Sequence, residues 1–141
     1  MIRIILYIIF LAILNSCELI VIGTKYSKQE IFNIDQTSAI GTVYLFKTEL
    51  DSNNISAATQ LLADSAGYKY LAIEKYEMRY EIARVKRLIG DMPITLVRTD
   101  TLTNHSQKIN VEFDYLKRMS FRTEMIDSAW YIVSYDEADF N

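Results

Sequence analysis

Apolar side chains recur every three or four positions between residues 35 and 50 of this 141-residue chain, which predicts an amphipathic helix. Asp35 or Thr37 is expected to cap the start of this helix, because either side chain can accept a hydrogen bond from a free backbone N–H. Gly41 either permits a close helix crossing or weakens the helix, since glycine costs about 1 kcal/mol there relative to alanine.

Two further helices follow. The residues from Asp51 to Asn54 favour a turn, and Asn54 is expected to cap a short helix that Gly67 closes. The third helix is predicted to end at Gly90 in a left-handed cap. Its apolar stripe consists of Leu71, Met78, Ile82, Val85 and Ile89. Acidic residues come early in this helix and most basic residues come late, so we expect a solvated face matched to the helix dipole.

After Pro93 the apolar spacing changes to two, which predicts strands. A first strand begins at Ile94, and Thr99 to Ser106 is interpreted as the loop after it. The apolar positions of the next two strands are Ile109, Val111, Phe113 and Tyr115, then Met119, Phe121, Thr123 and Met125. Asp127-Ser128 predicts a tight turn. Residues 136–141 are interpreted as an acidic, solvated tail.

The last predicted strand, residues 129–135, carries apolar side chains in both alternating sets. Trp130 and Ile132 belong to one set, and Tyr131, Val133 and Tyr135 to the other. A strand of this kind is usually covered on both faces. We therefore expect the helices on one face, and a partner chain or the N-terminal tether on the other.

Three helices followed by about four antiparallel strands predict a single α+β domain over residues 35–141, with the helices packed on one face of the sheet. Residues 39–62, with helix, turn and second helix, and the closing Ala129-Trp130-Tyr131-Ile132-Val133 resemble the nuclear-transport-factor-two-like superfamily. That resemblance implies a cone-shaped α+β fold, and it covers roughly residues 36–135. The long third helix departs from the superfamily pattern.

The N-terminus is apolar. One positive residue, Arg3, precedes an apolar run from Ile4 to Leu14, which is the length of a secretory signal and too short to span a bilayer. Leu14-Asn15-Ser16-Cys17 then resembles a bacterial lipobox. The resemblance implies that residues 1–16 are a cleaved signal peptide and that Cys17 is acylated. Residues 17–34 are then a lipidated N-terminus and tether, held firmly by several acyl chains.

A second interpretation stays open, because Leu19 to Ile22 is also apolar. Without cleavage, Ile4 to Ile22 would form an anchor helix of about 28 Å, close to the hydrocarbon thickness of a bilayer. Simple secretion is a third alternative. Each interpretation places the remaining chain outside the cytoplasmic membrane, and the two anchored forms keep it in the cell envelope.

Charge and composition exclude several functions. With a formal net charge of -3 the chain has no basic excess for a phosphate backbone, so we expect no nucleic-acid partner. One Cys and one His cannot form a structural zinc site or a disulfide, and no Gly-rich phosphate loop is present. We expect no metal and no cofactor. His105 lies in a predicted loop without a second catalytic partner.

Ten tyrosines are the remaining signal. Tyr76 and Tyr80 share a face of the third helix. Tyr44, Phe113, Tyr115 and Trp130 are candidates for an aromatic ligand pocket between the helices and the sheet. Ordinary core and boundary packing explains the same rings.

No catalytic set is evident, so we expect a membrane-tethered, non-enzymatic binding domain. Its partners would be the bilayer through acylated Cys17 and a second copy or another envelope protein. The alternatives are a small isomerase- or hydratase-like enzyme with an aromatic cavity, and a structural subunit of an envelope assembly. The enzyme would need a buried carboxylate near Tyr44 or Tyr115, whereas Glu112 and Asp114 are predicted on the polar face of their strand.

Overall fold

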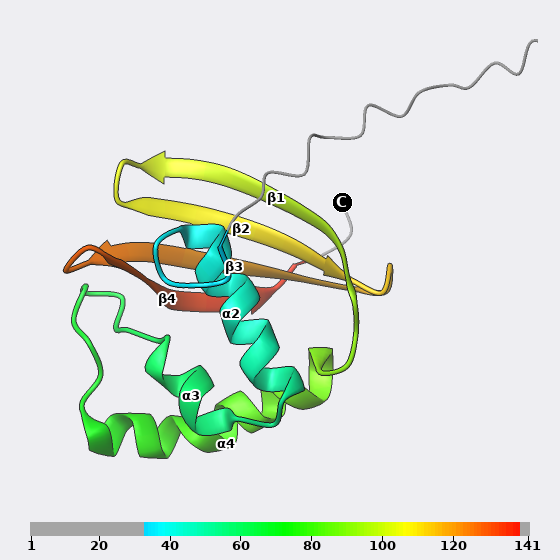
Figure 1. The fold of residues 1–141 in the computed structure, drawn as a ribbon, viewed down its shortest axis with the longest axis horizontal. Helices are drawn as coiled ribbons and strands as arrows, with labels where there is room; N and C mark the ends of the chain where they lie inside the picture. The colour runs from blue at the N-terminus through cyan, green and yellow to red at the C-terminus, as the bar shows by residue number, and fades with distance from the viewer. Residues whose placement is uncertain (1–32, 139–141) are drawn as a thin grey trace, which may run out of the picture. The chain divides into compact units, whose positions relative to one another are not determined.

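The computed structural model describes residues 33–138, which form three helices and a four-stranded antiparallel sheet (Figure 1). The elements are α2 (Ala39–Asp51), α3 (Ile55–Gln60), α4 (Ala72–Ile89), β1 (Ile94–Thr103), β2 (Ser106–Phe113), β3 (Lys117–Ile126) and β4 (Ala129–Glu137). The strand order is β1-β2-β3-β4, and the helices lie on one side of the sheet. The predicted α+β class is therefore confirmed. The predicted signal or anchor helix, Cys17 and most of the tether lie outside the described residues.

The start of α2 differs from the prediction. Ser38 is the cap, and its side chain accepts a hydrogen bond from the Gly41 N–H at 3.1 Å. Asp35 instead accepts from the backbone N–H of Thr37, one turn before the helix. The prediction of Asp35 or Thr37 as the cap was wrong, because several adjacent residues could have served and the path of the preceding chain decided among them.

Gly41 allows the segment before α2 to pass close to the helix. A Cβ on this residue would lie 2.4 Å from the carbonyl oxygen of Asn33 and 2.7 Å from that of Asp35. Real Cβ atoms do not approach backbone oxygens this closely. The close approach at Gly41 is therefore to the chain's own preceding segment and not to another helix.

The second helix, α3, is capped as predicted: Asn54 accepts from the Ala57 N–H at 3.2 Å. It ends at Gln60, however, and does not continue towards Gly67, which has a φ of 82° in a later turn. The chain leaves the helix to pair with β4, where Ile132 donates to the Leu61 carbonyl at 2.9 Å. The backbone groups that follow Gln60 therefore form hydrogen bonds to β4, which is distant in sequence, and not those of a further helical turn.

The third helix, α4, buries side chains completely only in its second half, and Met78 in its first half packs against the core while partly buried. Ile82, Val85 and Ile89 are buried, whereas Leu71, which was predicted on the same stripe, is 67% exposed. The predicted left-handed cap at Gly90 was wrong: Gly90 has φ −58° and ψ 145°, and Asp91 takes the left-handed conformation with φ 61°.

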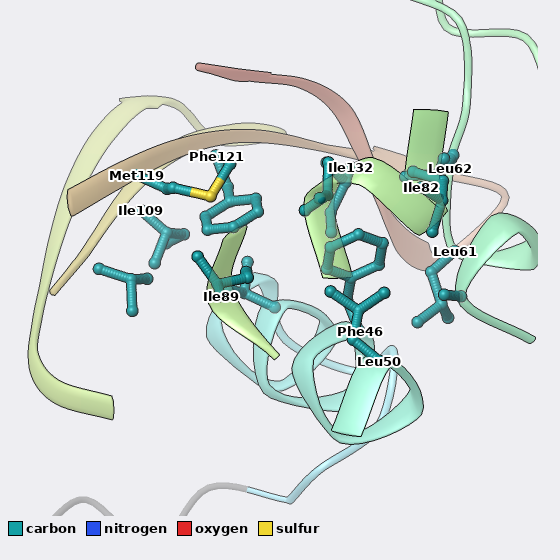
Figure 2. Packing of buried hydrophobic residues seen from close by; sticks show 14 of the residues in the cluster. Phe46, Leu50, Leu61, Leu62, Ile82, Ile89, Ile109, Met119, Phe121 and Ile132 are labelled. Carbon is teal, nitrogen blue, oxygen red and sulfur yellow. The ribbon is translucent and has the colours of Figure 1, made fainter. Parts of the chain in front are cut away.

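The core lies between the helices and the inner face of the sheet. Phe46 and Phe121 meet edge to face with ring centroids 6.1 Å apart, so α2 is held directly on β3 (Figure 2). Figure 2 also shows Ile89 of α4 on the helical side of Phe121. The side chains buried to 2% exposure or less include Phe46, Leu50, Leu62, Ile82, Ile89, Ile109, Val111, Phe113, Met119, Phe121 and Ile132.

The first strand is longer than predicted. β1 continues through the residues interpreted as a loop and reaches Thr103, leaving Asn104 and His105 as the turn before β2. The prediction of a loop from Thr99 to Ser106 was wrong because this half of β1 is exposed on both faces and shows no apolar alternation. Hydrogen bonding to β2, and not burial, holds it in the sheet.

The pairing of β4 with β3 is irregular, and this changes which face of the sheet the apolar side chains of β4 occupy. Arg122 of β3 lies opposite Ser134, but the next residue, Thr123, lies opposite Ile132, so Val133 forms a bulge. The bulge reverses the alternation, and Tyr135 packs against the core like Ile132 does. The expectation of a second continuous apolar face on β4 was therefore wrong. β4 also extends to Glu137, so Asp136 and Glu137 belong to the strand and not to a tail.

Candidate functional site

The four aromatic residues proposed as a pocket are not brought together. Phe113 lies opposite Lys117 at the β2–β3 hairpin, and Trp130 lies opposite Met125 near the β3–β4 turn. Those partners are eight residues apart on β3, which corresponds to about 26 Å. Phe113 and Trp130 are both part of the core, at 0% and 5% exposure.

The other two candidates also lie apart. Tyr115 is 74% exposed and occupies the β2–β3 turn with a left-handed backbone. Tyr44 is half-buried on α2, and burial raises the pKa of its hydroxyl. Of the four candidates, Phe113 and Trp130 are therefore core rings, Tyr44 is a boundary ring and Tyr115 is a surface ring.

Candidate catalytic and metal-binding groups are sparse in this domain. His105 is exposed in the β1–β2 turn, as predicted. Among residues 33–138, no group of three or more His, Cys, Asp or Glu side chains is placed to hold a metal ion. Glu112 is bound by Arg118 at 2.8 Å and lines the face of the sheet away from the helices together with Arg98 and Asn110.

The most distinctive surface lies on α4, on the side of the helix away from the core. Ile73, Tyr76 and Tyr80 follow one another at helical spacing and are 62%, 59% and 80% exposed. Large apolar side chains exposed together on one face are typical of contact surfaces. We call Ile73, Tyr76, Arg79 and Tyr80 the α4 surface.

Two hollows border this surface and share Tyr76 and Arg79. One, of about 250 Å³, lies between α3 and α4 and is also lined by Thr59, Gln60 and Lys75. The other, of about 290 Å³, is lined by Ile55, Tyr80 and Ala83. Because both hollows are lined by Tyr76 and Arg79, they lie next to each other along α4, and we call the pair the α4 groove.

Polar contacts hold the groove in shape. The Arg79 guanidinium lies 5.8 Å from the centroid of the Tyr76 ring, a cation–π arrangement. Lys75 donates to Gln60 at 2.7 Å and so links α4 to α3. The groove thus presents tyrosine rings beside two positive charges, which suits an apolar group carrying a negative charge.

The sequence contained the signal for this surface in part. The shared helix face of Tyr76 and Tyr80 was visible from their spacing, but the same spacing is typical of core packing. What sequence reasoning missed is that the core stripe of α4 begins effectively at Ile82. In the first half of the helix no side chain is fully buried, and its tyrosine rings lie in solvent.

The other displaced pKa values belong mainly to boundary residues. Burial raises the pKa of Tyr135 to about 12, and the nearby carboxylate of Glu81 adds to this shift. Burial also raises the pKa of Tyr70. Hydrogen bonds from Thr37 lower the pKa of the exposed Asp35 carboxyl. These shifts follow from packing and from the turn that Asp35 forms with Thr37.

The domain was also compared with known proteins. No family model matches the chain, and no curated protein matches it. Among residues 33–138, no helix is long and apolar enough to cross a membrane.

Proposed function

We propose that this chain is a membrane-tethered envelope lipoprotein, anchored through acylated Cys17, whose domain binds a partner and does not catalyse a reaction. The proposed membrane anchoring is supported by the apolar run from Ile4 to Leu14 and by the residues before Cys17. The described architecture is compatible with a nuclear-transport-factor-two-like domain, to which we assign it within this proposal.

The observation that carries the binding role is the α4 surface. Ile82 and Val85 of α4 are buried in the core, whereas Tyr76 and Tyr80 of the same helix are exposed to solvent. The two tyrosine rings therefore add nothing to the core and are accessible to a partner. Tyrosine and arginine are enriched where binding energy is concentrated in interfaces. The open, elongated groove suits a protein segment with apolar side chains and a carboxylate, which Arg79 and Lys75 would attract.

The tether would let this surface act close to a membrane. Sixteen residue steps separate Cys17 from Asn33, so a fully extended chain would span at most about 55 Å. The domain would then meet partners that share the same membrane at high effective concentration.

The geometry favours this proposal over the enzyme alternative. That alternative needs a carboxylate beside Tyr44 or Tyr115 in one enclosed aromatic cavity. Tyr115 lies in an exposed turn, and Glu112 is engaged by Arg118 on the sheet face away from the helices. A role as a subunit of an envelope assembly is compatible with a binding surface and differs only in the permanence of the contact.

Acylation and cleavage at Cys17 are tested by labelling the full chain with radioactive palmitate. The wild type is compared with Cys17→Ala, and the processed mass of each protein is measured. We expect label and cleavage only in the wild type. An unlabelled, full-length band in both proteins would instead indicate the uncleaved anchor formed by Ile4 to Ile22.

The binding role is tested by affinity purification of the tagged full chain from its own membranes. The double variant Tyr76→Ala/Tyr80→Ala should lose a co-purifying protein that the wild type retains. Tyr115→Ala is the matched control, because that ring is similarly exposed but lies in the β2–β3 turn and borders neither hollow. Equal recovery with all three proteins would contradict the assignment of the α4 surface.

A further inference from the structure

One edge of the sheet is open. β1 is the outermost strand in Figure 1, and its edge away from β2 has no partner among residues 33–138. The opposite edge, on β4, is partly covered: Trp130 donates to the Gln36 carbonyl, and Ile132 donates to that of Leu61. Unpaired edges are usually protected by proline, lysine or central bulges, because their free N–H and C=O groups can pair with another strand.

The central part of β1 has no proline, lysine or bulge, and its two charged residues, Arg98 and Asp100, are of opposite sign. Its register with β2 shifts only near its ends, between Ile94 and Leu96 and between Thr101 and Thr103. The stretch from Leu96 to Thr101 is regular and contains no proline, glycine or lysine. Leu96 and Leu102 are 39% and 51% exposed. A long, regular and partly apolar edge of this kind is suited to strand addition.

The residue order of β1 identifies the strand that it fits. We propose that β1 pairs antiparallel with β1 of a second copy of this chain, about a two-fold axis at Thr99. In this register Arg98 lies opposite the partner's Asp100, and Asp100 lies opposite the partner's Arg98. Leu96 lies next to the partner's Leu102, which is the extra residue at the register shift near the end of β1, and the reverse contact repeats on the other side of the axis. A two-fold interface must be self-complementary, and this sequence is so in both charge and apolarity.

The four side chains that would pair lie on one face of the sheet. Leu96 and Arg98 border the same hollow as Asn110 and Glu112, on the face away from the helices. Leu102 borders a second hollow on that face. Residues directly opposite in an antiparallel pair project to the same face, so the cross-strand contacts can form.

Neighbouring registers are disfavoured by charge. Moving the axis to Arg98 places two guanidinium groups opposite each other, and moving it to Asp100 does the same with two carboxylates. In the monomer Arg98 has no acidic partner within the described residues, and Asp100 accepts an amide hydrogen bond from Asn110 at 3.1 Å. The dimer supplies each charge with the opposite one.

The interface is small, since only the seven residues from Leu96 to Leu102 of each strand take part. Interfaces below the standard size of about 800 Å² per partner are usually weak. We therefore expect dimers at protein concentrations on the order of 100 μM, with free monomer at high dilution. Dimerisation through β1 does not depend on the proposed membrane anchoring, because it involves only residues of β1.

Disulfide trapping tests the register. In the full chain carrying Cys17→Ala and held in mild detergent, Thr99→Cys should form a disulfide-linked dimer, because the two residues at the axis lie about 5 Å apart. Thr101→Cys is the matched control: its two copies would be offset by four residues, about 13 Å, beyond disulfide reach. Equal cross-linking of both variants, or none with Thr99→Cys, would overturn the proposal.

Charge exchange tests the pairing by sedimentation equilibrium. Arg98→Asp and Asp100→Arg should each weaken dimerisation by roughly tenfold, and the double variant, in which the charges are exchanged, should restore it. Both residues are exposed, so thermal unfolding of the monomer should be unchanged in all variants. A wild type that stays monomeric at about 1 mM, or a double variant no better than the single ones, would contradict the inference.

Discussion

Lys47 and Asp51 form an ion pair on α2 although only 6% of Lys47 is exposed. The ammonium group also lies 6.0 Å from the centroid of the Phe113 ring. Asp51 accepts a second hydrogen bond, from the backbone N–H of Asp91 at 3.0 Å. One carboxylate therefore neutralises a buried charge and joins the end of α2 to the residues that follow α4.

Removing this carboxylate should be costly. Asp51→Ala leaves the Lys47 charge buried without its partner, and we expect a loss of about 2 kcal/mol in the free energy of unfolding. Lys47→Met removes the charge but keeps the buried stem, so its effect should stay within about 1 kcal/mol. Urea unfolding measures both.

The double variant separates the ion pair from other effects. In the Lys47→Met background, Asp51→Ala should cost only about 1 kcal/mol, for the lost hydrogen bond from Asp91. If the effects of Lys47→Met and Asp51→Ala on the free energy of unfolding are additive, Asp51 does not stabilise the buried charge of Lys47.

Gly41→Ala should destabilise the domain by about 1 to 3 kcal/mol, although alanine is the better helix former. The added Cβ would meet the backbone oxygens of Asn33 and Asp35. Gly67→Ala serves as a control, because open space surrounds that residue and only its φ of 82° opposes a side chain. Increased stability of Gly41→Ala in urea unfolding would refute the close approach of this segment.

The β2–β3 turn holds Tyr115 with φ 59°, a conformation that is costly for a residue with a Cβ. Tyr115→Gly should therefore be more stable than Tyr115→Ala by about 1 kcal/mol. At the exposed helical position Tyr80 the order should reverse, with glycine about 1 kcal/mol worse than alanine. Thermal unfolding of the four variants checks this prediction, and the same order at both positions would contradict it.

The pKa of Tyr135, raised to about 12, predicts a loss of stability in alkali. The folded state favours the neutral hydroxyl, because burial and the Glu81 carboxylate disfavour the phenolate, while Arg84 opposes this in part. The unfolded chain ionises near pH 10, so this contribution is fully present below pH 10 and is lost as the pH rises towards 12.

We expect the loss to be on the order of 1 kcal/mol at pH 11.5, since the hydroxyl is only partly buried. Urea unfolding at pH 8 and pH 11.5 measures it. Tyr135→Phe, which cannot ionise, should show a smaller decrease between these two pH values. Identical decreases in both proteins would show that other tyrosines cause the effect.

Local features of the chain were predictable where neighbouring residues decide them. Asn54 caps α3 as expected, because a side chain and an N–H three residues later make that contact without help from the rest of the fold. The order of helices before strands followed from the change in apolar spacing after Pro93. Asp127 and Ser128 form the tight turn that their residue types indicated.

The candidate site was predictable only in part, because exposure is a property of the whole domain. The spacing of Tyr76 and Tyr80 placed them on one helix face, but only the position of α4 relative to the sheet left that face in solvent. The proposed pocket of Tyr44, Phe113, Tyr115 and Trp130 included two rings, Phe113 and Trp130, that strand pairing places at opposite ends of the sheet.

Residue types and their spacing thus determined the α+β class, the number and order of helices and strands within residues 33–138, and most of the core. Tertiary structure decided on which face of the sheet the Tyr135 side chain lies, because the bulge at Val133 depends on the pairing of β4 with β3. It also decided that the polar half of β1 is a strand, since hydrogen bonds to β2 come from residues distant in sequence. Spacing records local periodicity, whereas pairing and burial are fixed by contacts that form only when the chain has folded.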